Sequence, residues 1–160
     1  MQEMVIYGVS FDMVGKQPIV LLKTVDGNRF LPIWIGHPEA AAILMKLQGA
    51  STPRPMTHDL LRNVISDLDG QVDRIVVSDL KENTFYAIIH LTVRGERVAV
   101  DARPSDAIAL ALRTRAPILV DERVIDHAKT VDLSNEKQDS DRLQQWLEQL
   151  DPDDMGKYKM

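Results

Sequence analysis

The stretch VDARPSDAIALALRTRAPI, residues 100–118, decides the fold because it places a strand end, a turn, a helix and a second strand in direct succession. Arg103-Pro104-Ser105 interrupts the strand, and Ser105 is expected to cap the helix that follows. Six consecutive apolar residues, 107–112, predict that this helix lies in the core. Pro117 then separates the helix from a short buried strand over 118–120. The stretch therefore predicts a buried helix flanked by strands.

Upstream of this stretch, the first third of the chain has the pattern of a β-meander. Short β-branched and aromatic runs predict strands over 4–9, 18–23 and 29–35, with a turn near 12–16. Asp26-Gly27-Asn28 is a strong hairpin signal between the second and third of them. Pro38 suits a first helical turn, and the small apolar residues after it predict a mostly buried helix that ends at Gly49.

The middle and end of the chain alternate between helix and strand patterns. Thr57 is a plausible N-cap for a helix whose apolar face carries Leu60, Leu61, Val64, Ile65 and Leu68. Strands are expected over 72–80, 84–93 and 97–102, and Asp121 starts a further helix. Residues 130–140 are expected to form a linker, 141–150 an amphipathic docking helix with Leu143, Trp146, Leu147 and Leu150 on one face, and 155–160 a frayed end.

These elements predict an α+β fold with a mixed, largely antiparallel sheet or sheets and packed helices. We expect one globular domain over 1–128 and an acidic C-terminal tail with one amphipathic helix over 129–160. The 160 residues carry a net charge of −5. Residues 1–120 contain 13 basic and 13 acidic residues, so the tail region 121–160, with 6 against 11, carries the whole excess. The tail is expected to repel or mimic nucleic acid. Truncation of the chain after Ala128 is expected to leave the fold intact.

Composition excludes several classes of protein. The chain has no cysteine, which excludes disulfide scaffolds, cysteine zinc sites and thiol catalysis. No apolar run approaches the length of a membrane span, and the first residues lack a basic leader region. We therefore expect a cytoplasmic protein with no membrane partner. No basic stripe of the kind that marks nucleic-acid binding is visible, and aromatic residues are too few for a base-stacking groove.

The segment Asp101 to Asp106 is the most informative chemical motif. It surrounds a helix N-terminus, where free N–H groups and the helix dipole suit a phosphate, and Arg103 can clamp one. Asp101 and Asp106 can hold a hard divalent cation, which would activate water for phosphodiester hydrolysis. The alternative is structural: Ser105 caps the helix, Asp106 complements its dipole, and Arg103 pairs with Asp101 or Asp106.

Two further motifs carry candidate site residues. In Thr57-His58-Asp59, the histidine is a candidate general base or metal ligand, but neighbouring helical residues do not share a face. His58 becomes a site residue if folding brings it to the Arg103 turn; otherwise the motif is a capped helix. In Gly36-His37-Pro38-Glu39, Glu39 is a candidate third carboxylate or simply an acid at a helix start. Trp34, in the apolar run just before Gly36, is expected in the core.

Three strings occur in an order and spacing that resemble the bifunctional nuclease domain family: FLPIWIGHPEAAAI (30–43), PRPMTHDLL (53–61) and VDARPSDAIALALRTRAPI (100–118). The resemblance covers roughly residues 4–128 and leaves the acidic tail outside. It implies a mixed α/β fold, homo-oligomers, and DNase and RNase activity. It transfers no established catalytic residues.

The leading hypothesis is thus an enzyme: a nuclease-like phosphodiesterase that acts on DNA and RNA with low sequence preference, assisted by Mg²⁺ or Mn²⁺. The candidate residues are Asp101, Arg103, Asp106 and His58 for catalysis; Arg103, Ser105 and Arg54 for substrate binding; and Asp101, Asp106, Asp59 and Glu39 for the metal. Oligomerisation is expected to gather arginines in one groove: Arg29, Arg54, Arg62, Arg103, Arg113 and Arg115. The alternative is a non-enzymatic homo-oligomeric scaffold that binds a small anionic ligand or a regulatory partner.

Overall fold

A computed structural model of the chain describes residues 1–11, 17–132 and 136–150. None of the helices in these ranges is long and apolar enough to cross a membrane. In chain order the elements are β1 (Gln2–Phe11), β2 (Pro18–Thr24), β3 (Arg29–Trp34), α1 (His37–Leu47), α2 (Thr57–Asp67), β4 (Gly70–Lys81), β5 (Thr84–Val93), β6 (Glu96–Ala102), α3 (Pro104–Thr114), β7 (Ile118–Val120), α4 (Glu122–His127), β8 (Val131–Asp132) and α5 (Glu136–Gln149).

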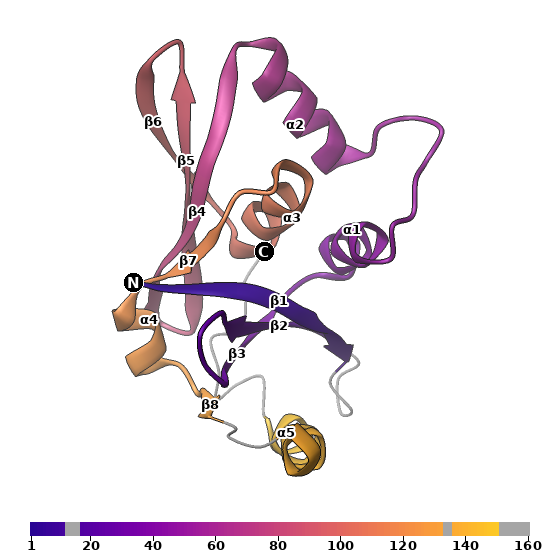
Figure 1. Ribbon diagram of the computed structural model, residues 1–160, viewed down its shortest axis with the longest axis vertical. Helices are drawn as coiled ribbons and strands as arrows, with labels where there is room; N and C mark the ends of the chain where they lie inside the picture. The colour runs from indigo at the N-terminus through magenta and orange to yellow at the C-terminus, as the bar shows by residue number, and fades with distance from the viewer. Residues whose placement is uncertain (12–16, 133–135, 151–160) are drawn as a thin grey trace.

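The strands form one mixed sheet in the order β6-β5-β4-β7-β1-β2-β3-β8 (Figure 1). Two antiparallel meanders, β1–β3 and β4–β6, are local in sequence. The three-residue β7 joins them, because it runs parallel to β4 on one side and antiparallel to β1 on the other. The sheet is therefore largely antiparallel with one parallel pair, which confirms the α+β class that the sequence predicts.

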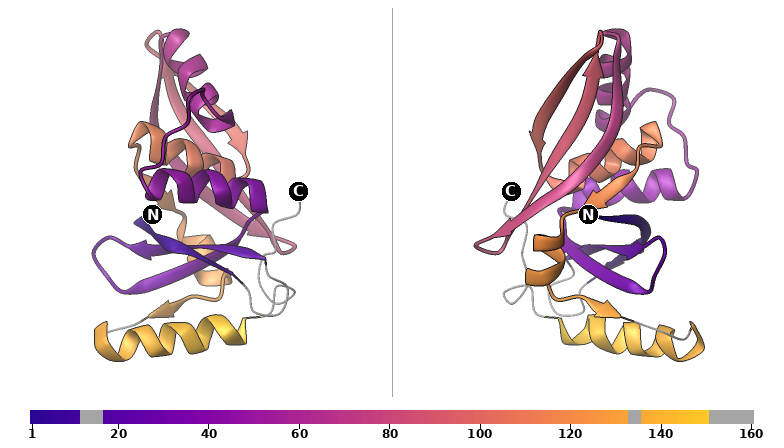
Figure 2. Two further views of the ribbon diagram at one scale, coloured as in Figure 1. Left: turned by 90° about the vertical axis from the view of Figure 1, so that its right-hand side faces the viewer. Right: turned by 60° about the vertical axis from the view of Figure 1, so that its left-hand side comes forward.

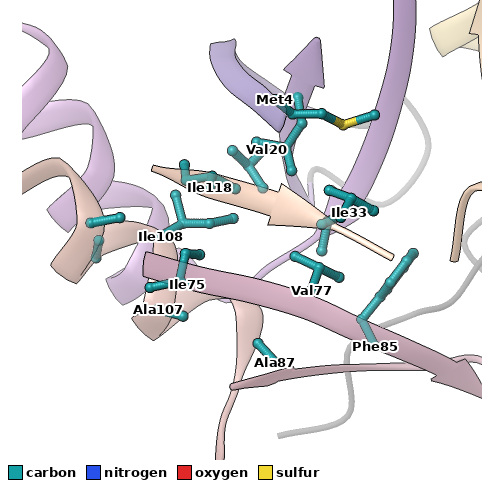
Figure 3. Close-up of a cluster of buried hydrophobic side chains, with 14 of the residues drawn as sticks. Met4, Val20, Ile33, Ile75, Val77, Phe85, Ala87, Ala107, Ile108 and Ile118 are labelled. Atoms are coloured by element: carbon teal, nitrogen blue, oxygen red, sulfur yellow. The ribbon is translucent and has the colours of Figure 1, made fainter. Parts of the chain in front are cut away.

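The main hydrophobic core lies between the sheet and the helices α1 and α3 (Figure 1). Residues 107–110 of α3 are fully buried, as the unbroken apolar run predicts. Figure 3 shows Ala107 and Ile108 from α3 facing Ile75 of β4 and Ile118 of β7. This core fixes α3 against the middle of the sheet, and with it the turn that precedes α3.

The strands β2 and β3 are buried on both faces. Val20 and Leu22 of β2 face the main core, whereas Ile19 and Leu21 face the other way and pack against α5. The same division in β3 places Phe30 and Trp34 under α5, so Trp34 is a core residue as expected. Figure 2 shows α5 lying across this outer face. Double burial explains why these strands are apolar at nearly every position rather than at alternate ones.

The helix α5 confirms the predicted docking helix but begins at Glu136, five residues before its expected start. Leu143 and Leu150 are only 7% exposed, and Trp146 and Leu147 pack beside them. The expectation that the fold stays intact after truncation at Ala128 does not fit this packing, because truncation uncovers the outer face of β2 and β3. The turn expected near 12–16 and the frayed end expected over 155–160 lie outside the described residues.

The start of α2 also differs from the sequence expectation. Its N-cap is Met56 rather than Thr57. The reason is that the Asp59 carboxylate, three residues on, accepts a hydrogen bond from the Met56 backbone N–H at 3.0 Å. A side-chain carboxylate three residues into a helix satisfies one of its open N–H groups, so Thr57 is not needed as a cap.

The apolar face of α2 is mostly exposed. Of the five residues that the sequence places on this face, only Ile65 packs against the main core. The other four residues are 36–59% exposed: Leu60, Leu61, Val64 and Leu68. The helix contacts α3 and β4, and its His58 is buried. Leu60, Leu61 and Val64 line a cavity, and exposed apolar surface is a feature that interaction surfaces share.

The docking of α5 predicts a stability difference between two leucines. Leu143→Ala should lower the free energy of unfolding by about 2–5 kcal/mol, because it leaves a cavity over Leu21 and Phe30. Leu60→Ala, at a position that is 55% exposed, should change it by less than about 0.5 kcal/mol. Urea denaturation followed by circular dichroism measures both. Equal losses in the two variants would show that α5 does not pack as described.

Candidate functional site

A cavity of about 860 Å³ lies between α1, α2 and α3 and is bounded by β5 and β6. Its walls are mostly apolar, from side chains such as Met45, Leu61 and Val100. Most of its polar lining lies where α1, α2 and α3 begin and consists of Glu39, Thr57, His58, Asp101, Arg103 and Asp106; Arg113, near the end of α3, also lines the cavity. The three predicted motifs, which are far apart in the sequence, therefore meet in one cavity.

The guanidinium of Arg103 organises this polar end. Its Nη2 donates to Glu39 Oε1 at 2.6 Å, and its Nε and Nη2 donate to Asp106 Oδ2 at 3.0 and 2.9 Å. The other Asp106 oxygen, Oδ1, lies 2.8 Å from His58 Nε2. These contacts form a continuous chain, Glu39–Arg103–Asp106–His58, which we call the charged relay. It joins the first turns of α1, α2 and α3.

The relay favours the ionised forms of Asp106 and Arg103. The hydrogen bond from His58 lowers the pKa of Asp106; partial burial opposes this, but the bonds from Arg103 add to it. For Arg103, burial works against the charged form, yet the hydrogen bonds to Glu39 and Asp106 raise its pKa overall. An ionised Asp106 only accepts hydrogen bonds, so His58 Nε2 must be the donor. In a neutral imidazole this leaves the lone pair on Nδ1.

Glu39 is the buried end of the relay. Its side chain is only 9% exposed, and its second oxygen, Oε2, is buried without a hydrogen-bond partner among the described residues. A buried carboxylate needs compensation, which Arg103 supplies on one oxygen only. The unpartnered oxygen therefore marks this end of the cavity as a place where a donor group of a ligand would be stabilised.

A second guanidinium, that of Arg113, lies behind the relay. Its side chain is 4% exposed and donates to Asp59 Oδ1 on α2 at 2.8 Å, to the Ala42 carbonyl of α1 at 3.1 Å and to the Ala109 carbonyl of α3 at 2.9 Å. The hydrogen bond from the Met56 N–H lowers the pKa of Asp59; burial opposes it, and Arg113 adds to it. Asp59 is thus an ionised structural partner of Arg113.

The structure separates the predicted site residues into three groups. His58, Arg103 and Asp106 join the relay, as the motif hypothesis requires, and Asp101 is exposed on β6 and lines the same cavity. Arg54 and Asp59 line a smaller neighbouring cavity. Ser105 is not part of the relay and lines neither cavity. The expectation that it caps α3 is wrong, because Arg103 is the N-cap and the Ser105 hydroxyl is fully buried without a partner within the described chain. Its expected role in substrate binding stays a prediction.

The four predicted metal ligands do not form a common ligand set. Arg103 stands between Glu39 and Asp106, and Asp59 is bound to Arg113 in a different cavity. Across the described ranges, no group of three or more acidic or histidine side chains is arranged to hold a metal ion. A divalent cation prefers several carboxylate oxygens at once, and here a guanidinium occupies the place between two of them. In this arrangement the residues do not fit the expected metal.

Sequence reasoning missed two roles. It treated Glu39 as a third carboxylate and did not pair it with Arg103, 64 positions away. It assigned Arg113 to a surface groove, whereas Arg113 is a buried clamp between three helices. The available signal was the same in both cases: a charged residue inside an otherwise apolar helix pattern. Such a residue is rarely buried without a partner of opposite charge.

Comparison with known proteins identifies the family. The fold and the relay define a mixed α+β domain with a charged cavity between three helices, and the family model described as the bifunctional nuclease domain matches residues 20–132. The chain therefore belongs to the bifunctional nuclease domain family. All members of the relay lie within the matched range, whereas α5 lies outside it.

Individual relatives fall into two groups. An uncharacterized protein of Mycobacterium tuberculosis (strain H37Rv) is 38% identical over 163 residues, which cover 96% of this chain and 98% of the relative. Bifunctional nuclease 1 of Oryza sativa subsp. japonica is 27% identical over 66% of this chain, and bifunctional nuclease 2 of Arabidopsis thaliana is 27% identical over 78%. The alignments span only 33% and 40% of those plant proteins.

The lowered pKa of Asp106 predicts a change in acid stability. Because the pKa is below its ordinary value in the folded chain, the relay contributes stability above about pH 4, and this contribution is lost as the pH falls through the folded-state pKa. Asp106→Asn should lower the free energy of unfolding by about 1.5–3 kcal/mol at pH 7, the range for hydrogen bonds to a charged group. The variant should also lose less stability than the unmodified chain between pH 5 and pH 2.5.

Urea unfolding at a series of pH values measures this effect. Asp101→Asn, which removes an exposed carboxylate from the same cavity, is the matched control. If Asp106→Asn keeps the full acid-dependent loss of the unmodified chain, the ionised Asp106 does not stabilise the relay.

Proposed function

We propose that the chain is a nuclease that hydrolyses phosphodiester bonds in DNA and RNA with low sequence preference, at the cavity that contains the relay. The observation that carries the proposal is the convergence of Glu39, His58, Arg103 and Asp106 from three helix N-termini into one cavity. Membership of the bifunctional nuclease domain family supports it. The names of the plant relatives support it further.

The relay suggests a role for each residue. Asp106 orients the His58 imidazole by accepting from Nε2, which leaves Nδ1 as the base. A water oxygen bonds to phosphorus as the bond to the leaving nucleoside oxygen breaks, and one proton of that water passes to Nδ1. The leaving oxygen takes a proton from solvent water and departs as an alcohol. The positive charge of Arg103, held by Glu39, stabilises the negative charge that develops on the phosphoryl oxygens. No step in this scheme passes through a metal ion.

Substitution of His58 tests the role of the relay in cleavage. His58→Asn should lower the cleavage rate of labelled RNA and single-stranded DNA by about 100-fold or more, because a positioned general base contributes about 10²–10⁴. His127→Asn, on the exposed surface of α4, should leave the rate unchanged. Gel-based rates for both variants, with melting temperatures to confirm folding, decide the matter. Equal rates in the two variants would remove His58 from the reaction.

The divalent cation that the sequence predicts stays a prediction, and the same assay tests it. If cleavage is lost in EDTA and returns with Mg²⁺ or Mn²⁺, the metal is required, and it must bind in an arrangement other than the one described. If cleavage continues in EDTA, the metal-assisted hypothesis is wrong. The cytoplasmic location expected from the composition also remains a prediction.

We also propose that the chain forms homo-oligomers through the exposed apolar residues of α2 that border the relay cavity. Leu60, Leu61 and Val64 line this cavity together with Val100 of β6, and all four residues are exposed. Contiguous apolar surface of this kind is rare on a monomer unless it serves an interaction.

The oligomer proposal predicts a difference between two exposed apolar positions. Leu60→Lys, at a position 55% exposed on α2, should lower the molar mass at a given concentration, because it places a charge in the interface. Val25→Lys, at a position 52% exposed in the hairpin turn, should not. Size-exclusion chromatography with light scattering measures both. A monomeric mass for the unmodified chain throughout the micromolar range would contradict the proposal.

A further inference from the structure

A second cavity, of about 300 Å³, lies beside the relay cavity and shares Met45 and Arg113 with it. We call it the basic pocket. It is formed by the end of α1, the first turns of α2 and the connector between these helices, residues 50–55. The relay mechanism uses none of its other charged residues.

The charge of the basic pocket is opposite to that of the chain. Four basic side chains and one acidic side chain line it: Lys46, Arg54, Arg62, Arg113 and Asp59. Arg113 neutralises Asp59 through their 2.8 Å contact, so three positive charges remain in a protein whose net charge is −5. A local concentration of positive charge on an acidic protein attracts anions to that place rather than to the surface in general.

The pocket is also held in shape. Arg113 is fixed by three acceptors, and the Arg62 side chain is oriented by its Nε and Nη2 bonds to Asn63 Oδ1 at 3.3 and 3.1 Å. In the connector, the Thr52 hydroxyl donates to the Arg54 carbonyl at 2.6 Å. The prolines at positions 53 and 55, one on each side of Arg54, restrict the backbone further. Arg54 is therefore presented from a stiff segment, which lowers the entropic cost of binding.

The chemistry of the lining selects the ligand. Guanidinium groups bind phosphate oxygens through paired N–H donors, and a lysine adds a point charge. The lining offers no aromatic ring on which a base could stack. We infer that the basic pocket binds a backbone phosphate of a polynucleotide whose neighbouring segment lies in the relay cavity. This inference rests on the proposed nuclease function, and it explains how an acidic chain without a basic stripe holds a nucleic acid.

Salt-dependent binding tests the inference. The probe is a fluorescein-labelled 12-nucleotide single-stranded RNA, and fluorescence anisotropy gives its Kd at several salt concentrations. Arg54→Gln/Arg62→Gln should weaken binding at least tenfold at moderate salt and reduce the slope of log K against log salt by about 0.7, the value for one lost phosphate contact on a single strand. Arg54→Lys/Arg62→Lys, which keeps both charges, should recover most of the slope.

The matched control is Arg74→Gln/Arg97→Gln, which removes two exposed arginines from β4 and β6. Long-range electrostatics alone would make both double variants lose affinity equally, and that result would overturn the inference. A fourth arm replaces the RNA by inorganic phosphate at constant ionic strength. If phosphate raises the melting temperature while the RNA does not bind, the pocket takes a free anion and the inference is wrong.

The outcomes separate this inference from the proposed nuclease activity. Weakened RNA binding in Arg54→Gln/Arg62→Gln, together with no cleavage by the unmodified chain, would support the pocket and reject the nuclease. Normal cleavage that depends on His58, together with unchanged RNA affinity and salt slope in Arg54→Gln/Arg62→Gln, would keep the nuclease and overturn the pocket. Electrophoresis of the recovered RNA shows whether it stayed intact during the binding measurement.

Discussion

The buried guanidinium of Arg113 is the contact on which the arrangement of the site depends. It bonds to α1, α2 and its own α3 at once, so it fixes the three helices whose first turns carry the relay. A buried charge is costly to leave unpaired, so Asp59 and the two carbonyls must remain in place while the chain is folded. Arg113 also lines both cavities, and its position therefore sets the wall between them.

The relay and the basic pocket use the same residue types in different ways. In the relay, arginine lies between two carboxylates, and the resulting network holds a histidine in a defined orientation. In the basic pocket, a single carboxylate faces four basic groups, which leaves the positive charge uncompensated. One arrangement suits proton transfer at a positioned base, and the other suits anion binding. The adjacency of two cavities with these properties supports the proposed cleavage of a polyanion.

Much of the fold follows from local patterns in the sequence. The meanders, the buried α3 and the docking of α5 are visible as turn signals, unbroken apolar runs and helical spacing. The exposure of the apolar face of α2 cannot be predicted in this way, because periodicity shows that a face is apolar without showing what covers it. The N-cap at Met56 was missed for a similar reason: it depends on a side chain three residues away.

The site is only partly readable from sequence. The motifs around Glu39, His58 and Arg103 contain the residues that meet in the cavity, since buried or turn-forming charges are conspicuous in apolar surroundings. Their pairing is set by tertiary packing, and the Arg103–Glu39 and His58–Asp106 contacts join residues 64 and 48 positions apart. The expected metal ligands show the same limit. A list of carboxylates cannot reveal that a guanidinium will stand between two of them.

The short strand β7 has a consequence for how the chain folds. Each meander closes through contacts between near neighbours, but Gln2 pairs with Val120, at opposite ends of the body. Joining distant segments costs more chain entropy and slows folding, so the meanders are expected to form first and β7 to join them late. During synthesis the β1–β3 meander would leave the ribosome before β7 is made, and the edge of β1 would stay unpaired until then. Its dependence on chaperones should be greatest in that interval.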